Sequence, residues 1–169
     1  MSKLINQKMV ESIHSTGCFT KNGDKKRIEH LEEYNLPFDK KAENVIITGC
    51  LNVFSLMDSI KSLANIFDHY GVSYTFLSKE YCCGNYLYRP AIKVRDQEAL
   101  NKCQEISKEF VGKNLEYSKQ LGAKCIILFC PPCYPVYKYA FPEENIIFYP
   151  EALNKVMDII NYKGKMHNK

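Results

Sequence analysis

CIILFCPPC, residues 125–133, is the stretch of sequence that decides the fold. It joins an uninterrupted apolar run to two cysteines, Cys130 and Cys133, which flank Pro131 and Pro132. A short apolar run of this kind is typical of a strand that is buried on both faces. The two prolines stiffen the loop that follows. The stretch therefore predicts a buried strand that leads directly into a pair of thiols.

Two earlier segments follow the same plan. Residues 45–48 (VIIT) predict a strand that ends at Gly49 and Cys50, and residues 72–77 (VSYTFL) predict a second strand shortly before Cys82 and Cys83. A fourth strand is expected at 146–149. Helical spacing predicts helices at 56–70, at 96–120 with a break at Gly112 left open, from 134, and at 151–162. This alternation predicts an α/β fold, a parallel sheet of about four strands with helices on both faces.

Five of the eight cysteines follow the ends of the first three predicted strands. The carboxyl ends of parallel strands meet at one edge of a sheet, which is where ligands bind in open α/β folds. We therefore expect one site to contain Cys50, Cys82, Cys83, Cys130 and Cys133. Thiolates gathered in this way repel one another and require a cation.

Iron is the metal that this set of thiols favours. Zinc takes four ligands in a closed tetrahedral site, so five cysteines exceed its need. A multi-iron cluster is larger and is held by cysteine thiolates. Three simpler interpretations stay open at this point. Cys130 and Cys133 alone are also compatible with a thioredoxin-like disulfide motif or half of a zinc site, the adjacent pair Cys82 and Cys83 with no joint role, and Cys50 with a core position.

The three cysteine groups, with Gly84 after the adjacent pair, resemble the cysteine-rich CCG domain of heterodisulfide reductase, and related domains occur in glycerol-3-phosphate and lactate oxidation proteins. The resemblance covers about residues 43–158. It includes the segment 114–133 (NLEYSKQLGAKCIILFCPPC) and the turn at 149–153 (YPEAL). It implies a Rossmann-like domain in which the five cysteines bind a noncubane [4Fe-4S] cluster.

The resemblance also implies a function and partners. In the methanogen enzyme, two such domains in one chain face each other and cleave the disulfide of coenzyme M and coenzyme B between their clusters. This chain resembles one half of that pair, so it would need a homodimer or a paired CCG-domain subunit. It also departs from the family at 85–90 (NYLYRP), where glycines are usual, and its gap to Cys130 is longer, with extra residues within 85–103.

The flanking segments divide the chain into three parts. Residues 1–43 predict an N-terminal helical extension, either wrapped on the domain or docking to another subunit, with a charged surface helix at 24–34 (DKKRIEHLEEY). Residues 44–162 form the CCG domain, and residues 163–169 a basic, frayed C-terminal tail. Outside the main set, Cys125 is expected in the core and Cys18 to be incidental, or else close to the cluster. Cys103 has no predicted role. Arg89 is either a surface residue or a site for an anionic substrate group.

Composition bounds the functions that remain. The 169 residues carry a net charge of +4 without an arginine stripe, so nucleic acid is not expected as a partner. The apolar runs are too short to cross a bilayer, and no signal segment opens the chain, so a cytoplasmic protein is expected. The leading hypothesis is an iron–sulfur subunit that reduces a small disulfide or transfers electrons. It would receive them from ferredoxin-like or flavin-containing subunits, because the chain has neither ferredoxin nor nucleotide-binding motifs. The alternatives are a zinc- or cluster-stabilised docking module and a metal-free thiol–disulfide enzyme.

Overall fold

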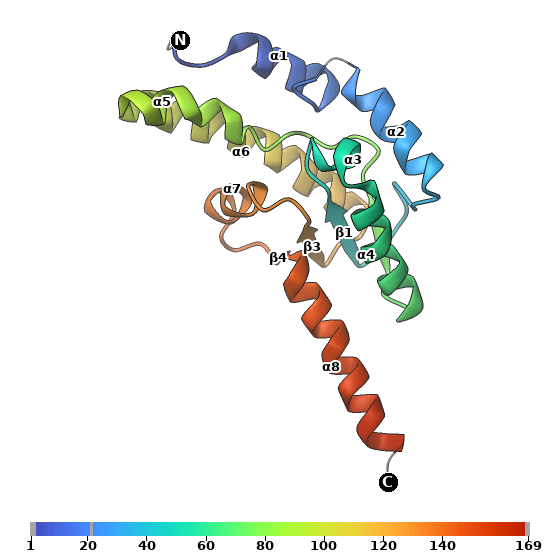
Figure 1. Ribbon diagram of the computed structural model, residues 1–169. Helices are drawn as coiled ribbons and strands as arrows, with labels where there is room; N and C mark the ends of the chain where they lie inside the picture. Colours follow the sequence, from blue (N-terminus) through green and yellow to red (C-terminus); the bar gives the residue numbers. More distant parts are fainter. Residues whose placement is uncertain (1–2, 21, 168–169) are drawn as a thin grey trace.

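Four parallel strands form the centre of the molecule, in a computed structural model that describes residues 3–20 and 22–167 (Figure 1). The strands are β1 (Asn44–Ile47), β2 (Tyr74–Phe76), β3 (Cys125–Leu128) and β4 (Ile146–Phe148). They lie in the order β2-β1-β3-β4, and all three pairings are parallel. The predicted α/β fold is confirmed. All four carboxyl ends lie at the same edge of the sheet.

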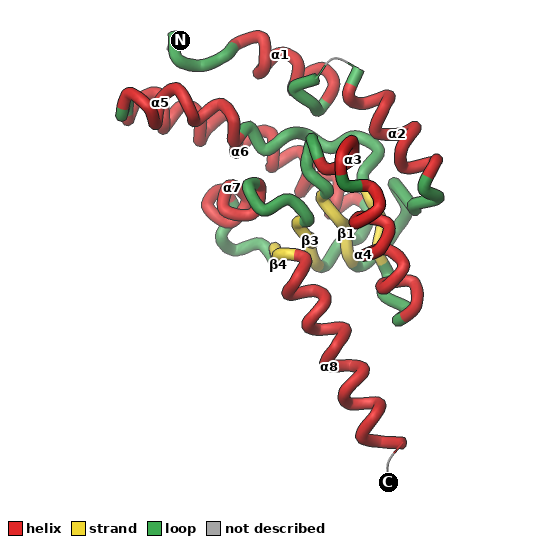
Figure 2. The backbone as a smooth tube through the Cα atoms, in the orientation of Figure 1, coloured by secondary structure: helices red, strands yellow, loops and turns green. Residues whose placement is uncertain are grey.

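Helices cover both faces of the sheet (Figure 2). On one face, α4 (Met57–His69) and α8 (Tyr149–His167) pack against Ile46 and Ile127. On the other, α6 (Gln97–Gln120) and α7 (Cys133–Ala140) pack against Val45 and Ile126. Because successive strand residues point to opposite faces, neighbouring apolar residues serve both cores. This explains why the strands are apolar runs without alternation.

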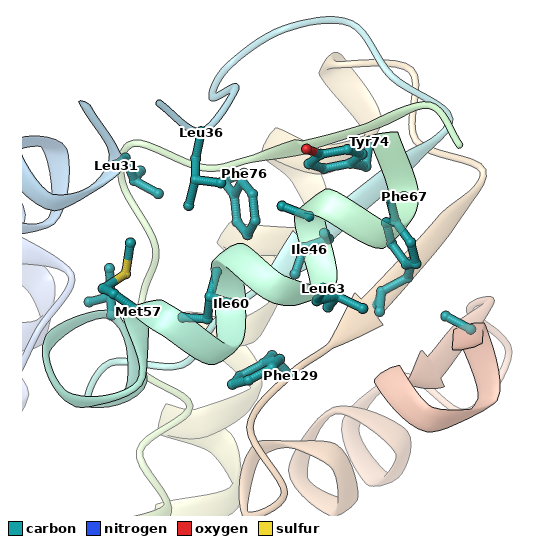
Figure 3. Packing of buried hydrophobic residues seen from close by; sticks show 14 of the residues in the cluster. Leu31, Leu36, Ile46, Met57, Ile60, Leu63, Phe67, Tyr74, Phe76 and Phe129 are labelled. Carbon is teal, nitrogen blue, oxygen red and sulfur yellow. The ribbon is translucent and has the colours of Figure 1, made fainter. Parts of the chain in front are cut away.

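The largest core lies between α4 and the sheet (Figure 3). Ile60 and Phe67 of α4 are fully buried there beside Phe76 of β2 and Ile46 of β1. Burial of each such side chain contributes about 2 kcal/mol relative to exposure to water. This packing fixes β1 and β2 side by side, and with them the loops that follow their carboxyl ends.

Three helices differ from the sequence-based expectation. The helix predicted at 56–70 is preceded by a separate turn, α3 (Asn52–Ser55). α6 continues through Gly112 without a break, because a side chain there would come within 3.3 Å of Phe141, so the glycine serves close packing. α8 continues to His167, beyond the end predicted at 162, since no proline after Pro150 interrupts it. It extends away from the rest of the molecule (Figure 1).

The N-terminal arm, residues 1–43, packs against the sheet domain wherever the structure describes it. It contains α1 (Gln7–Thr16) and α2 (Gly23–Glu33). Ile13 of α1 is fully buried in a cluster with Phe110 of α6, and Leu31 of α2 lies in the main core. Phe38 forms a parallel bridge to Phe76 at the outer edge of β2. Among the described helices, none has the length and apolar character needed to cross a membrane.

Candidate metal centre

The five predicted cysteines line a single cavity of about 170 Å³ at the carboxyl edge of the sheet. Cys50 lies shortly after β1, Cys82 and Cys83 lie in the loop after β2, and Cys130 and Cys133 lie between β3 and α7. The other residues that line the cavity are Leu51, Asn52, Asn85, Tyr86, Arg89 and Pro132. The predicted convergence of three distant segments is confirmed. The role of each thiol stays a prediction.

Four of the sulfurs form two close pairs. The Cys50 Sγ lies 3.1 Å from the Cys82 Sγ, and the Cys133 Sγ lies 3.2 Å from the Cys83 Sγ. The adjacent residues Cys82 and Cys83 thus face different partners. Within the described ranges 3–20 and 22–167, no three Cys, His, Asp or Glu side chains converge closely enough to ligate a single metal ion.

Hydrogen bonds between the thiols divide them into two kinds. The Cys50 thiol donates to the Cys82 sulfur, which raises the pKa of Cys50 and lowers the pKa of Cys82. In the same way, the Cys133 thiol raises its own pKa and lowers the pKa of Cys130 by donating to the Cys130 sulfur. Some thiols therefore ionise only at the expense of their neighbours. A bound cation would allow the whole set to be deprotonated together.

Gly49 allows the loops after β1 and β3 to approach each other. Its φ is +87°, in the left-handed region that favours glycine. A Cβ atom at this position would lie 2.5 Å from the Cβ atom of Cys130 and 3.0 Å from its sulfur. A side chain at residue 49 would therefore push Cys130 away from Cys50.

A buried ion pair lies directly behind the cavity and was missed from the sequence. Arg27 of α2 and Glu80 are 4% and 5% exposed, and the Arg27 guanidinium donates to Glu80 Oε2 at 2.7 Å. The same carboxylate accepts from the backbone N–H groups of Thr48 and Gly49, at 2.9 and 2.6 Å. The charged helix predicted to lie on the surface thus contributes one cation to the interior. Its sequence offers no signal for this, because Arg27 is one of several charged residues there.

A second buried polar group, Asn114 of α6, holds the loop that carries the adjacent cysteines. Its side-chain oxygen accepts from the backbone N–H of Tyr81 at 2.7 Å, and its amide donates to the Tyr81 carbonyl at 2.7 Å. It also donates to the Tyr137 hydroxyl of α7 at 2.6 Å. Asn114 and Tyr137 are fully buried. Asn114 therefore links the segment before Cys82 to the helix that begins at Cys133.

The three remaining cysteines lie outside the cavity lining. Cys125 is half-buried at the start of β3 and packs against the core, as predicted. Cys103 is buried in α6 and donates to the Leu87 carbonyl at 3.4 Å. Cys18, in the N-terminal arm, is buried with its sulfur 3.0 Å from Thr20 Oγ1 and 3.7 Å from the Cys50 carbonyl oxygen. It thus approaches the site through the Cys50 backbone.

The mouth of the cavity carries a cation over an aromatic ring. The Arg89 guanidinium lies 4.8 Å from the centre of the Tyr86 ring, and both residues line the cavity. Both are exposed, and none of the residues that line the cavity is acidic. The segment that departs from the family pattern therefore supplies the only charged side chain among those lining residues.

The donor set fits a multinuclear metal centre. Five cysteine sulfurs surround one cavity, with adjacent residues directed to different neighbours. Thiolates of this number are the ligands that iron–sulfur clusters use. The geometry, with the hydrogen bonds behind the loops already formed, thus defines the class of protein as one with a cysteine-rich metal or redox centre on a parallel α/β sheet.

The chain belongs to the CCG cysteine-rich domain family, which it matches over residues 44–136, more than half of its length. This confirms the family predicted from the three cysteine groups. The match begins at β1 and ends within α7. It contains all five cavity cysteines, and the N-terminal arm lies outside it.

Two curated relatives are the same subunit of dihydromethanophenazine:CoB–CoM heterodisulfide reductase, from two methanogens. The protein from Methanosarcina mazei is 26% identical over 110 residues, which cover 64% of this chain and 25% of that protein. The protein from Methanosarcina acetivorans is 27% identical over 131 residues, which cover 75% of this chain and 30% of that protein. The chain therefore spans less than a third of the length of these relatives. No solved structure matches it significantly.

Proposed function

We propose that this chain is an iron–sulfur redox subunit of the heterodisulfide-reductase type. In this proposal, Cys50, Cys82, Cys83, Cys130 and Cys133 hold a noncubane [4Fe-4S] cluster. The chain either reduces a small disulfide or transfers electrons within a complex of several subunits. The observation that carries the proposal is the convergence of five sulfurs from three loops on one cavity. The family match and the two heterodisulfide reductase relatives support it.

The chain's own residues would prepare the site before a cluster binds. Glu80 and Asn114 hold the backbone beside Cys50 and Cys82, so little ordering remains to be done on metal binding. Pro131 and Pro132 stiffen the loop between the last two thiols. A bound cluster would supply single-electron transfer next to a substrate sulfur.

Electron counting implies partners. Reduction of a disulfide to two thiols takes two electrons and two protons, and one cluster passes electrons singly. A second CCG domain, from another copy of the chain or from a paired subunit, would supply the other electron. Ferredoxin-like or flavin-containing subunits would deliver both. The proposed domain organisation is an N-terminal extension at 1–43, the cluster domain at 44–162 and a basic segment at 163–169.

The substrate would enter at the exposed mouth of the cavity. Tyr86 and Leu51 offer apolar surface there, and Arg89 offers a cation. A small thiol or disulfide with an anionic group meets both features. The guanidinium can bind a planar carboxylate through two parallel hydrogen bonds.

Anaerobic purification followed by metal and sulfide analysis tests the proposal. Brown protein with about four iron and about four sulfide per chain, and a paramagnetic signal that changes on reduction, is the expected result. Colourless protein with one zinc and no sulfide would refute the iron–sulfur function and favour a zinc-stabilised docking module instead.

Single serine variants assign the ligands. Cys50→Ser and Cys133→Ser are expected to lose most of the iron and sulfide, because each removes one member of a sulfur pair. Cys125→Ser is the matched control, since Cys125 lies on β3 away from the cavity. Equal iron content in Cys50→Ser, Cys133→Ser and Cys125→Ser would contradict the assignment.

A further inference from the structure

We infer that the N-terminal arm is a working part of the metal centre, and that Arg27 and Glu80 are positioning residues that fix the cysteine loops after β1 and β2. The arm lies outside the family match, which begins at residue 44. The inference depends on the proposed function only in requiring that the five cysteines hold a metal. Neither Arg27 nor Glu80 lines the cavity, so both would act through the backbone of the loops.

One guanidinium spans both loops. Arg27 Nε donates to the Leu77 carbonyl at 2.7 Å, and its Nη2 to Glu80 Oε2 at 2.7 Å, both in the segment that leads from β2 to Cys82. Its Nη1 donates to the Thr48 hydroxyl at 2.8 Å, in the segment that leads from β1 to Cys50. A planar fork of donors can hold three acceptors in this way, whereas the ammonium group of a lysine cannot reproduce the geometry.

The Glu80 carboxylate completes the connection. One of its oxygens accepts from the Thr48 N–H and hydroxyl, at 2.9 and 3.0 Å, and the other accepts from the Gly49 N–H at 2.6 Å. Glu80 is two residues from Cys82, and Gly49 is next to Cys50. The carboxylate therefore sets the separation of the two loops that carry the sulfurs 3.1 Å apart. Buried and without Arg27, it would be an uncompensated charge.

The arm contacts the same loops at two more points. The Gly17 carbonyl accepts from the Cys82 N–H at 2.7 Å, and the Cys18 thiol lies 3.7 Å from the Cys50 carbonyl oxygen. Gly17 has a φ of +75°, and a Cβ atom there would lie 2.5 Å from the Glu80 carbonyl oxygen. The arm thus reaches the backbone of both cysteines as well as the ion pair behind them. A segment that served only to dock another subunit would have no need of these contacts.

Metal retention in four variants of the full chain tests the inference. The variants are Arg27→Met, Glu80→Gln, the double variant Arg27→Met with Glu80→Gln, and Lys26→Met as the control, since Lys26 is exposed on the same helix. Each is purified anaerobically. The rate of iron loss to a ferrous chelator, the paramagnetic spectrum and the thermal midpoint are measured on the same sample.

We expect Arg27→Met and Glu80→Gln to lose iron about tenfold faster than the wild type, as is usual when a group behind a metal ligand is removed. Lys26→Met is expected to match the wild type. The double variant removes both charges, so its thermal midpoint should recover relative to Arg27→Met. Glutamine offers one acceptor oxygen in place of two, so it cannot hold both Thr48 and Gly49. Fast iron loss and an altered spectrum should therefore persist in the double variant.

Two outcomes overturn the inference. One is iron loss at the wild-type rate in both single variants. The other is a double variant that regains wild-type iron retention together with its thermal midpoint, which would make the pair purely structural. Iron-free wild-type protein that carries zinc refutes the proposed function instead, and the same comparison with a zinc chelator then decides the inference. Wild-type protein without any metal would overturn both.

Discussion

Replacing Asn114 with alanine is expected to lower the stability of the protein by about 3 kcal/mol. The substitution leaves the N–H and carbonyl of Tyr81 without their partners, and both groups are buried by α6 and the cysteine loop. Each buried polar group left unpaired costs about 1 to 3 kcal/mol. For a chain of this size, the thermal midpoint should therefore fall by about 6 to 12 °C.

Differential scanning calorimetry under anaerobic, reducing conditions measures this change, with variants matched in metal content. Asn101→Ala is the control, because Asn101 lies on the same helix and is largely open to solvent. It should change the stability by less than about 0.5 kcal/mol. Asn114→Asp should be at least as harmful as Asn114→Ala. It keeps the acceptor for the Tyr81 N–H but places a carboxylate oxygen against the Tyr81 carbonyl.

The result that would refute this reasoning is an Asn114→Ala midpoint equal to that of Asn101→Ala. It would mean that water replaces the amide without loss, or that the loop rearranges to satisfy Tyr81 elsewhere. A variant that is destabilised and also loses metal would show that the loop before Cys82 must be held for the site to form.

Two further predictions concern the surroundings of the cavity. Cys18→Ser should retain the iron and sulfide content of the wild type, because the Cys18 sulfur bonds to Thr20 and does not line the cavity; a loss comparable to that of Cys50→Ser would make it a sixth ligand. Arg89→Met should bind 3-mercaptopropionate about fivefold more weakly, the size expected of an exposed ion pair, with binding of neutral 3-mercaptopropan-1-ol unchanged in calorimetric titration. Lys93→Met, on the same short helix, should leave both affinities as they are, and an equal effect of both variants would exclude a specific role for Arg89.

The order and direction of the sheet elements could be predicted because local patterns encode them. The apolar runs at 45–48 and 125–129 can only be buried strands, and the helical spacing between them imposes parallel connections. Once the strands are parallel, cysteines at their carboxyl ends must share one edge. The candidate site was thus predictable without coordinates, including its position relative to the sheet.

Some boundaries depended on packing that no local pattern encodes. Gly112 read as a break in the helix, whereas in the folded chain Phe141 occupies the space that a side chain would fill. The helix after β4 continues past residue 162. In both places, glycine and charged residues weaken the local signal without preventing a helix.

The sequence by itself determined the fold class, the family and the five thiols, because periodic burial and strand direction follow from local composition. Only the tertiary structure decided which sulfurs pair and which polar groups are buried behind them. Arg27 and Glu80 lie 53 residues apart, and Asn114 and Tyr81 lie 33 apart. A buried charge or amide is stable only when its partner is present, and that partner is set by how distant segments pack. The groups that hold the cysteine loops therefore become visible only in the folded chain.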